Sequence, residues 1–379
     1  MDYTKEPLLF KLKKVTRYVS MYGLERTFKK VRSQYHMKAS PSFDGERWIN
    51  EKGSKDGDVA IIGCGNFAFS TIAHYVSKKT EGKIKYTLDT DKAKALSLAK
   101  EYGAYCATAR YDEVLNDSGI KVVYIASNHS THAEYAIQAI EKGKDVHIEK
   151  PHIVNYEQLV RLEKAMLAHP ESRVFMGFNR PKSKLFEKLL HEIKLQPGNI
   201  MMNWFIAGHE IDDNHWYFSE AEGGRVMGNL CHWSDLCIHL VGLENAFPCT
   251  ISPAIANEAK SNFAISITFA DGSQAALTFS AKGHTFEGVR EYLNVHKGDL
   301  LASLRDFENL SLDIVDKKQY RKLFHRDHGH SANITHSYNA HKNDTSGESL
   351  EYIRGTGLLV LKIKEALDTN SIVHCENRL

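Results

Sequence analysis

From residue 58 onward the chain alternates short apolar runs with amphipathic segments. The apolar runs predict buried strands at 59–63, 83–88, 122–126 and 146–148. Helical patterns lie between them at 66–80, 91–102 and 132–142, the last two of which stop at Gly103 and Gly143, residues suited to a helix C-terminus. Strands and helices alternating at this pitch predict a parallel, doubly wound sheet.

Beyond residue 175 the pattern changes to strict alternation of apolar and polar positions. Residues 263–269 and 274–280 alternate in this way, and Asp271-Gly272 between them predicts a hairpin turn. A last amphipathic helix is expected at 351–368. We therefore predict an α/β fold class in which the doubly wound parallel sheet is followed by an α+β domain with a mainly antiparallel sheet.

The first forty residues carry a separate pattern. Leu8, Leu12, Val15, Val19 and Tyr22 follow one helical face, Gly23 interrupts it, and a second short stripe begins at Leu24. This segment holds ten Lys/Arg and three Asp/Glu, whereas the remaining residues hold 39 and 44. Two hypotheses stand: a cationic helix that contacts a membrane surface or a partner, and an arm packed on its own body with a solvated basic face, which the modest stripe favours. Residues 39–57 indicate a connector.

The composition argues against some classes of protein but does not identify the function. Because the excess of positive charge is confined to the arm, the charge distribution does not indicate a nucleic-acid-binding surface over the whole chain. No apolar run reaches the length of roughly 18–20 residues that a membrane-spanning helix needs. The six cysteines have no paired or metal-type spacing, and the start of the chain lacks a signal-peptide pattern, so we expect reduced thiols and a cytoplasmic location.

A glycine-rich turn follows the first strand of the alternating region. In Gly63-x-Gly65-x-x-Ala68 the first glycine allows a tight turn, the second lets backbone approach phosphates, and the small third residue lets helix and strand pack closely. The N-terminus of the following helix would supply N–H groups and a positive dipole end to a pyrophosphate. The predicted cofactor-binding residues here are Gly63, Gly65, Asn66, Phe67 and Ala68.

Asp89 ends the second strand, 21 residues after Ala68. A carboxylate at this place hydrogen-bonds the ribose hydroxyls of the adenosine half and repels a 2′-phosphate. No arginine adjoins it, so NAD is favoured over NADP. The alternative is that Asp89 only caps the helix that starts near Asp91.

Two further strand ends add candidates at the same edge of the sheet. Ser127 and Asn128 follow the third buried strand, and His132 begins the next helix. His132 could contact the cofactor or could have a structural role. Lys150 follows the fourth strand, where the nicotinamide ring would reach. A lysine there is suited to polarise a substrate oxygen as charge develops on it.

Glu149-Lys150-Pro151 together with the glycine turn resembles the glucose–fructose oxidoreductase / inositol dehydrogenase family (Gfo/Idh/MocA). The similarity continues in Gly177-Phe178-Asn179-Arg180, in His215-Trp216 and in the run 223–236 around Asn229 and His232. The arm around Tyr22-Gly23 through Tyr35-His36-Met37 is similar to the segment that precedes this domain in a subgroup fused elsewhere to a zinc alcohol dehydrogenase-like domain, and we do not expect that extra domain here.

The resemblance implies a Rossmann domain, a second domain whose open sheet often forms an oligomer interface, a nicotinamide cofactor and sugar, inositol or nucleotide-sugar substrates. It implies that Lys150 and His232 are catalytic, His232 as the proton relay. It further implies cofactor contacts for Glu149, Lys150 and Arg180. The substrate candidates are Lys150, Asn179, Arg180, His215, Trp216, Asn229 and His232.

One position departs from the family pattern. Many members place an aspartate four residues before the histidine, and here that position is Gly228. Asp213 or His215 could compensate. Histidines are also frequent elsewhere: His232, Asp235 and His239 share a helical face, and five more fall between 325 and 341, but none forms a recognised zinc pattern, so we expect no metal.

The sequence thus predicts three segments: an arm and linker at 1–57, an NAD-binding Rossmann domain at 58–176, and a substrate and oligomerisation domain at 177–379. The favoured function is hydride transfer between nicotinamide and a hydroxyl or carbonyl carbon of a sugar or nucleotide sugar, in polysaccharide metabolism, by a cytoplasmic homo-oligomer. The alternatives are an NAD-dependent glycoside hydrolase or lyase and a redox-silent dinucleotide-binding scaffold.

Overall fold

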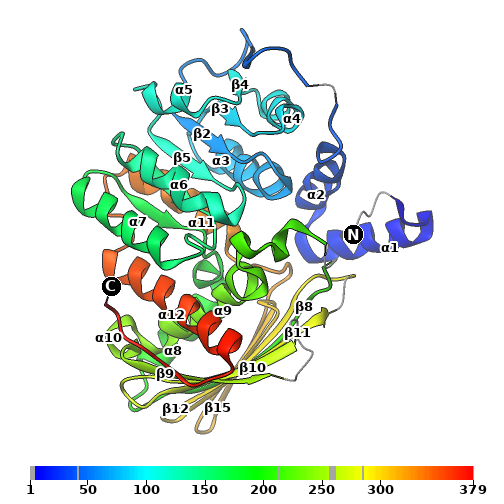
Figure 1. Ribbon diagram of the computed structural model, residues 1–379. Coiled ribbons are helices and arrows are strands. Elements are labelled where there is room, and N and C mark those ends of the chain that lie inside the picture. Colours follow the sequence, from blue (N-terminus) through cyan, green and yellow to red (C-terminus); the bar gives the residue numbers. More distant parts are fainter. Residues whose placement is uncertain (1–4, 41, 212–213, 256–261, 284–285, 379) are drawn as a thin grey trace. The chain divides into compact units, whose positions relative to one another are not determined.

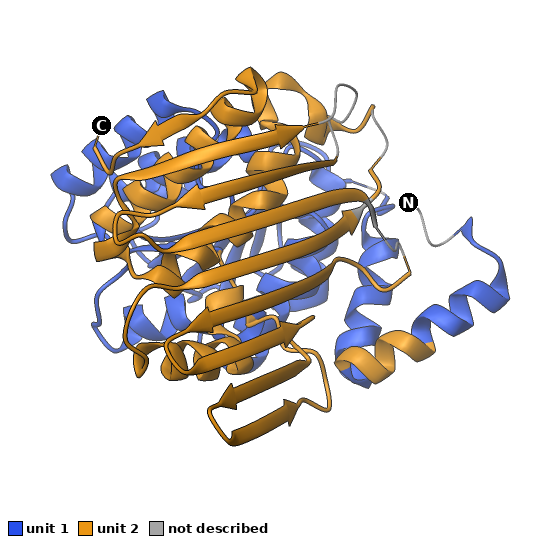
Figure 2. Ribbon diagram, turned by 90° about the horizontal axis from the view of Figure 1, so that it is seen from below, with its two compact units in different colours: residues 1–15, 23–177, 330–350 blue, residues 16–22, 178–329, 351–379 orange. Residues whose placement is uncertain are grey.

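The structure is a computed structural model that describes residues 5–40, 42–211, 214–255, 262–283 and 286–378. The chain divides into two units (Figures 1 and 2). Unit 1 holds residues 1–15, 23–177 and 330–350, and unit 2 holds residues 16–22, 178–329 and 351–379. The predicted third segment, 177–379, is therefore interrupted, since residues 330–350 belong to unit 1.

Unit 1 is built on a seven-stranded sheet in the order β1-β4-β3-β2-β5-β6-β7. All neighbours are parallel except β1 and β4. The strands are β1 (Arg47–Ile49), β2 (Val59–Ile62), β3 (Ile84–Leu88), β4 (Cys106–Thr108), β5 (Val122–Ile125), β6 (Asp145–Ile148) and β7 (Val174–Met176). The predicted doubly wound sheet is confirmed, with β1 as an addition: it lies in the segment expected to be a plain connector.

The helices predicted at 66–80, 91–102 and 132–142 are confirmed as a π-helical turn (Ala68–Ile72) that continues into α3 (Ala73–Lys79), as α4 (Lys92–Tyr102) and as α6 (His129–Ile140). Three more helices of this unit, α5 (Tyr111–Asn116), α7 (Tyr156–Ala168) and the late helix α11 (His330–Lys342), were not predicted. α6 begins at His129, three residues before the predicted start. α11 packs against α3 and β6, and Tyr338 Oη donates to Asp58 at 2.7 Å.

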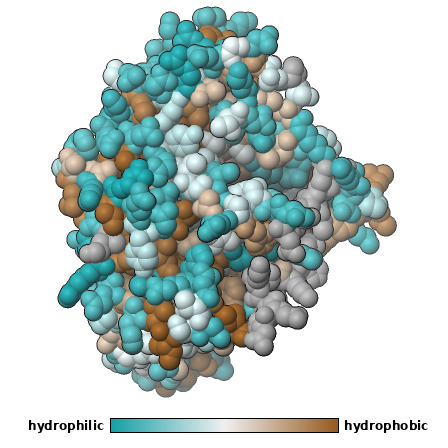
Figure 3. Space-filling model, in the orientation of Figure 1, coloured by the Kyte–Doolittle hydropathy of each residue, from teal (hydrophilic) through white to brown (hydrophobic). Residues whose placement is uncertain are grey.

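The N-terminal arm forms α1 (Leu8–Tyr22) and α2 (Leu24–His36), separated at Gly23 with φ +81°. α2 packs on unit 1, where Arg26 donates to Thr71 Oγ1 at 2.6 Å and Lys29 pairs with Glu101 at 2.7 Å. The first part of α1 is instead exposed: Leu8, Leu9 and Leu12 have 55% or more of their surface in solvent, whereas Val19 and Tyr22 at its end are half-buried. Figure 3 shows apolar and polar side chains mixed at this helix.

Unit 2 contains a nine-stranded sheet in the order β15-β14-β13-β12-β8-β11-β10-β9-β16, antiparallel except for the β8–β11 pair. The strands are β8 (Met201–His209), β9 (Cys249–Ile255), β10 (Asn262–Thr268), β11 (Gln274–Gly283), β12 (Arg290–Lys297), β13 (Leu300–Arg305), β14 (Asn309–Ile314), β15 (Lys317–Lys322) and β16 (Val373–Cys375). The predicted hairpin is the β10–β11 pair.

The helices of unit 2 cover one face of this sheet, and Figure 2 looks onto the other. They are α8 (Lys184–Lys194), α9 (Cys231–Val241), α10 (Leu243–Ala246) and α12 (Leu350–Thr369), with short 3₁₀ turns at Arg180–Lys182, Trp216–Phe218 and Glu220–Glu222 and a π-helical turn at Val226–Leu230. Trp204 and Trp233 are fully buried in the core of this unit. The open face carries exposed apolar side chains, among them Met201, Phe205 and Leu301.

Candidate functional site

The two glycines of the turn after β2 differ in what the protein requires of them. Gly63 has φ +83°, and a Cβ there would lie 2.4 Å from the backbone nitrogen of Ser127. Gly65 does not adopt positive φ, and a Cβ there would meet nothing within 4 Å. The fold therefore demands glycine at 63, but at 65 it leaves the space above the turn open.

The helix after this turn begins at residue 66. Its first N–H groups have no acceptor within the helix, so they present a positive dipole end at the open side of the turn. Asn66 and Phe67 are half-buried there, and Ala68 is buried, as close packing on the sheet requires. This arrangement fits the pyrophosphate of a dinucleotide.

Asp89, which directly follows β3, accepts hydrogen bonds from two backbone N–H groups, one of them in the glycine turn. Its Oδ2 accepts from the backbone N–H of Cys64 at 2.7 Å, and its Oδ1 accepts from the N–H of Asp91 at 2.8 Å. The cap of α4 is Asp91 itself, whose side chain accepts from Ala93 and Lys94. The helix-capping alternative for Asp89 is therefore wrong, and its carboxylate stands beside the glycine turn.

Ser127, Asn128 and His132 follow β5 as predicted, but they differ in exposure. Asn128 is exposed, and the Ser127 hydroxyl lies 2.7 Å from Thr131 Oγ1. His132 is buried with Nε2 at 2.9 Å from the Ser127 carbonyl and Nδ1 at 2.8 Å from the Pro151 carbonyl. It thus links the loop after β5 to the loop after β6, and burial lowers its pKa despite these bonds.

Lys150 lies at the carboxyl end of β6, half-buried, and the Lys150–Pro151 peptide bond is cis. Glu149 beside it is buried, with Oε1 at 3.4 Å from His147 Nε2. Gly177 passes close by, since a Cβ there would lie 2.8 Å from Glu149 Oε2. The two neighbouring residues of the motif therefore differ in exposure: Lys150 is half-buried, whereas Glu149 is buried within the protein.

In unit 2 the predicted site residue Arg180 is part of a buried ion pair. Its Nε donates to Glu291 Oε2 at 2.8 Å and its Nη2 to Oε1 at 3.1 Å. Trp233 Nε1 donates to the same carboxylate at 2.9 Å, and His328 Nε2 lies 3.1 Å from it. Burial alone would raise the pKa of Glu291, yet Arg180 and His328 outweigh burial and lower that pKa to about 2.

Asn179, adjacent to Arg180, is also engaged within unit 2. Its side-chain amide donates to the His328 carbonyl at 2.6 Å. The structure thus brings Asn179 and Arg180 together around one cluster, formed by Arg180, Trp233, Glu291 and His328. No pattern in the sequence indicated that Glu291 or His328 would contact Arg180.

The other predicted residues of unit 2 lie on and before α9. His232 is in the first turn of α9, buried, with its ring 6.1 Å from that of Phe178. Asn229 precedes it in the π-helical turn and accepts from Arg225 at 3.3 Å. His215 and Trp216 are exposed. Asp213 lies outside the described residues.

The histidines considered for a metal contact different groups. Asp235 accepts from Tyr352 at 2.6 Å and lies 3.6 Å from His239, whereas His341 lies 2.7 Å from Asp145. In the described part of the chain, no three His, Cys, Asp or Glu side chains are grouped so as to hold a metal ion. Nor does any helix of the described residues have the length and apolar character to cross a membrane.

The region that contains the glycine turn matches a protein-family model. The model of the oxidoreductase family with an NAD-binding Rossmann fold, Gfo/Idh/MocA, matches residues 58–178. Residues 58–178 are therefore similar to the NAD-binding domain of this family. Oxidoreductase P35 of Formosa agariphila is 30% identical over an aligned length of 199 residues, and the alignment covers 49% of this chain and 61% of that protein. Inositol 2-dehydrogenase of Burkholderia ambifaria is 28% identical over 136 residues, 36% of this chain and 40% of that enzyme.

The alignments thus span less than two thirds of these relatives' lengths. A levoglucosan dehydrogenase structure in complex with NADH and levoglucosan superposes with a TM-score of 0.70 at 18% identity, covering 83% of this chain and 98% of that one. At this identity the likeness shows the fold of both units. The Rossmann-type fold with a second, mainly antiparallel domain is therefore confirmed.

Proposed function

We propose that this protein is an NAD-dependent oxidoreductase that transfers a hydride between nicotinamide and a hydroxyl or carbonyl carbon of a sugar or inositol. The observation that carries the proposal is the open space at Gly65, at a helix N-terminus whose N–H groups suit a pyrophosphate. Asp89 at the end of β3 favours NAD, because a 2′-phosphate would meet its negative charge.

In this proposal the bound nicotinamide would donate or accept the hydride, and the chain's own residues would hold and polarise the substrate. Lys150, at the end of β6 in unit 1, donates to the substrate oxygen as negative charge develops on it. His232, in the first turn of α9 in unit 2, is the second residue that we propose for catalysis, as a proton relay. Trp216, exposed on its 3₁₀ turn, offers a flat apolar face to a sugar ring.

The substrate class is suggested by the relatives. An inositol dehydrogenase aligns with the NAD-binding region, and the levoglucosan dehydrogenase shares the fold. Both names denote enzymes of polyhydroxylated ring compounds. We extend this to nucleotide sugars and to a role in polysaccharide metabolism as the finer part of the proposal, together with a homo-oligomer that buries the exposed apolar side chains of the open sheet face.

The test is turnover by the purified protein. Mixed with NADH and a panel of keto-sugars, keto-inositols and keto nucleotide sugars, it should consume NADH, and Lys150→Ala should abolish this loss while NADH binding stays intact. Lys164→Ala, which removes an exposed lysine of α7, is the matched control and should turn over normally. Turnover retained in Lys150→Ala would overturn the catalytic assignment.

The same assay separates the alternatives. Glycoside cleavage without net change in NADH would support the hydrolase or lyase chemistry. Binding of NADH without turnover or cleavage across the panel would support the scaffold.

A further inference from the structure

Cys64, at the centre of the glycine turn, is hydrogen-bonded through both its backbone N–H and its backbone carbonyl. The N–H of Cys64 donates to Asp89, as described above, and the carbonyl of Cys64 lies 2.6 Å from Nε2 of His36. His36 is the last residue of α2, so this second contact comes from the N-terminal arm. The arm thus reaches the turn that would carry the cofactor.

The hydrogen bonds fix the roles of the two ring nitrogens. A carbonyl oxygen only accepts, so Nε2 of His36 donates to Cys64. Nδ1 lies 2.9 Å from Ser97 Oγ on α4, and in the neutral ring it accepts from that hydroxyl. Burial lowers the pKa of His36, which keeps the ring neutral near pH 7.

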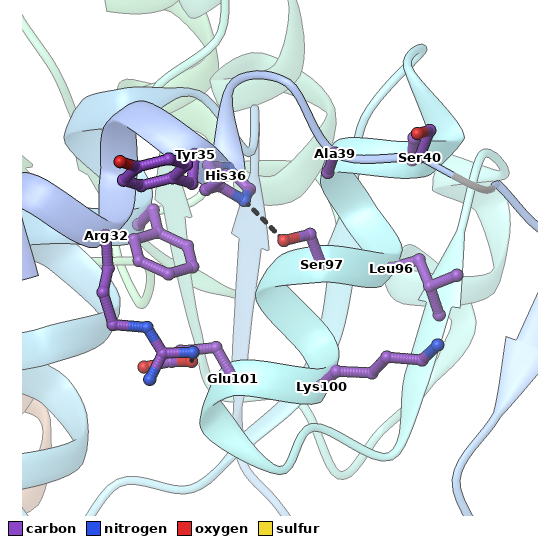
Figure 4. Close-up of a pocket in the computed structure, with 11 residues that line it drawn as sticks. Arg32, Tyr35, His36, Ala39, Ser40, Leu96, Ser97, Lys100 and Glu101 are labelled. Atoms are coloured by element: carbon purple, nitrogen blue, oxygen red, sulfur yellow. Dashed lines mark hydrogen bonds and ion pairs between the residues drawn. The ribbon is translucent and has the colours of Figure 1, made fainter. Parts of the chain in front are cut away.

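The ring is also held by packing. It stacks on Phe69 with 4.2 Å between ring centroids and 22° between planes, and only 4% of His36 is exposed. Figure 4 shows His36 directed at Ser97 across the edge of a cavity of about 550 Å³. The cavity lining includes Arg32, Tyr35, His36, Ser97, Lys100 and Glu101.

The contact matters because the Cys64 carbonyl and the Gly65 N–H belong to one planar peptide unit. In a trans unit they point in opposite directions, so the bond to His36 fixes the direction of the Gly65 N–H. The next two residues start the helix whose N–H groups face the open side of the turn. An arm histidine therefore fixes the direction of the Gly65 N–H, next to the N-terminus of this helix.

We propose that His36 is a positioning residue for the dinucleotide, which makes the N-terminal arm a third component of the cofactor site alongside the glycine turn and Asp89. This proposal rests on the function proposed above. It gives the arm a role in nucleotide affinity that does not depend on a membrane or a partner.

The experiment is a fluorescence titration of NADH with the full chain. His36→Phe keeps a ring on Phe69 but removes the donor, and it should raise the dissociation constant about five- to tenfold, the cost typical of one lost hydrogen bond. His36→Gln places an amide N–H near the position of Nε2 and should restore affinity to within about twofold of wild type. Melting temperatures of both variants check that the fold is intact.

The matched control is Tyr35→Ala, which removes an exposed side chain from the same helix turn and the same cavity. It should leave NADH affinity within about twofold of wild type, since it makes no donor available to the turn. Phe and Gln variants that weaken binding equally, or a Phe variant that binds like wild type, would overturn the positioning role. A wild-type protein that binds no NADH would overturn the proposed function as well, and the two failures are thereby distinguished.

Discussion

The glycine turn of unit 1 and the Arg180 cluster of unit 2 are both polar, but they use their hydrogen-bonding groups differently. In the cluster, each oxygen of Glu291 is taken up by protein donors, and the guanidinium lies over the Trp233 ring at 4.9 Å. At the turn, a Cβ on Gly65 would meet only open space above a helix N-terminus. The first arrangement holds the protein together, whereas the second leaves donors for a ligand.

Two predicted site residues, Arg180 and Gly65, differ in whether contacts within the protein account for them. Arg180 and Gly65 both stood in motifs that resemble the same family. The bidentate pair with Glu291 accounts for Arg180 within the fold, whereas nothing in the fold accounts for glycine at 65. Substitutions in the cluster should therefore affect stability, and substitutions at the open side of the turn should affect binding.

The largest expected effect is at Glu291. Glu291→Leu leaves the Arg180 guanidinium buried without its carboxylate, and the free energy of unfolding should fall by about 3–5 kcal/mol. Urea denaturation measures this. Asp313→Asn in the same unit removes the partner of Lys318, which is 79% exposed, and should cost no more than about 0.5 kcal/mol. Similar losses in the two variants would contradict the structural role of the cluster.

The same carboxylate predicts a pH dependence. Since the folded pKa of Glu291 is about 2, below its ordinary value of 4.5, its stabilising effect is present above about pH 4.5 and is lost as the pH falls toward 2. The shift corresponds to roughly 3 kcal/mol. The stability gap between wild type and Glu291→Gln should therefore be constant above about pH 5 and should narrow in acid. A gap that does not change with pH would show that Glu291 is not ionised in this way.

Gly63 tests the part of the turn that the fold itself requires. Gly63→Ala forces a side chain into both positive φ and the backbone of Ser127, and should destabilise the protein by about 2–3 kcal/mol. Gly103→Ala isolates the first effect, because Gly103 has φ +66° but an open Cβ position, and it should cost about 1 kcal/mol. Equal costs at the two positions would mean that the contact with Ser127 relaxes easily.

A smaller effect is expected at Asp89. Asp89→Asn keeps an acceptor for the Cys64 N–H but removes the charge that disfavours a 2′-phosphate. The ratio of NADPH to NADH dissociation constants should fall about tenfold, mainly through tighter NADPH binding. Parallel titrations with the two nucleotides measure this ratio, and an unchanged ratio would remove Asp89 from cofactor selection.

Much of the fold could be predicted because its signals are local. The strands β2, β3, β5 and β6 and the helices α3, α4 and α6 were predicted from apolar spacing, whereas β1, β4, α5 and α7 were not. The capping residue Gly103 adopts the left-handed conformation that its position suggested. The hairpin around Asp271-Gly272 was also predicted from the local sequence. In contrast, nothing in the order of the chain indicates that α11 returns to unit 1 after the sheet of unit 2 has been completed.

The candidate site was predictable to a lesser extent, because side-chain contacts join distant positions. Glycine at 63 and at 65 look alike in a motif, and only the structure separates a steric requirement from an open surface. Arg180 was assigned to a ligand through its motif, whereas its contact with Glu291, which lies 111 residues away without a pattern of its own, could not be predicted. His36 was noted only as part of the arm, since no local signal relates it to the Cys64 carbonyl.

The most direct test of the central claim, that the glycine turn binds a nicotinamide dinucleotide, is NADH binding by Gly65→Ala. A methyl group at this position meets no protein atom, so the free energy of unfolding should stay within about 0.5 kcal/mol of wild type or rise slightly. The NADH dissociation constant should nevertheless rise at least about tenfold, because the methyl occupies the approach of the phosphates. A variant that is stable and binds NADH as tightly as wild type would contradict the account.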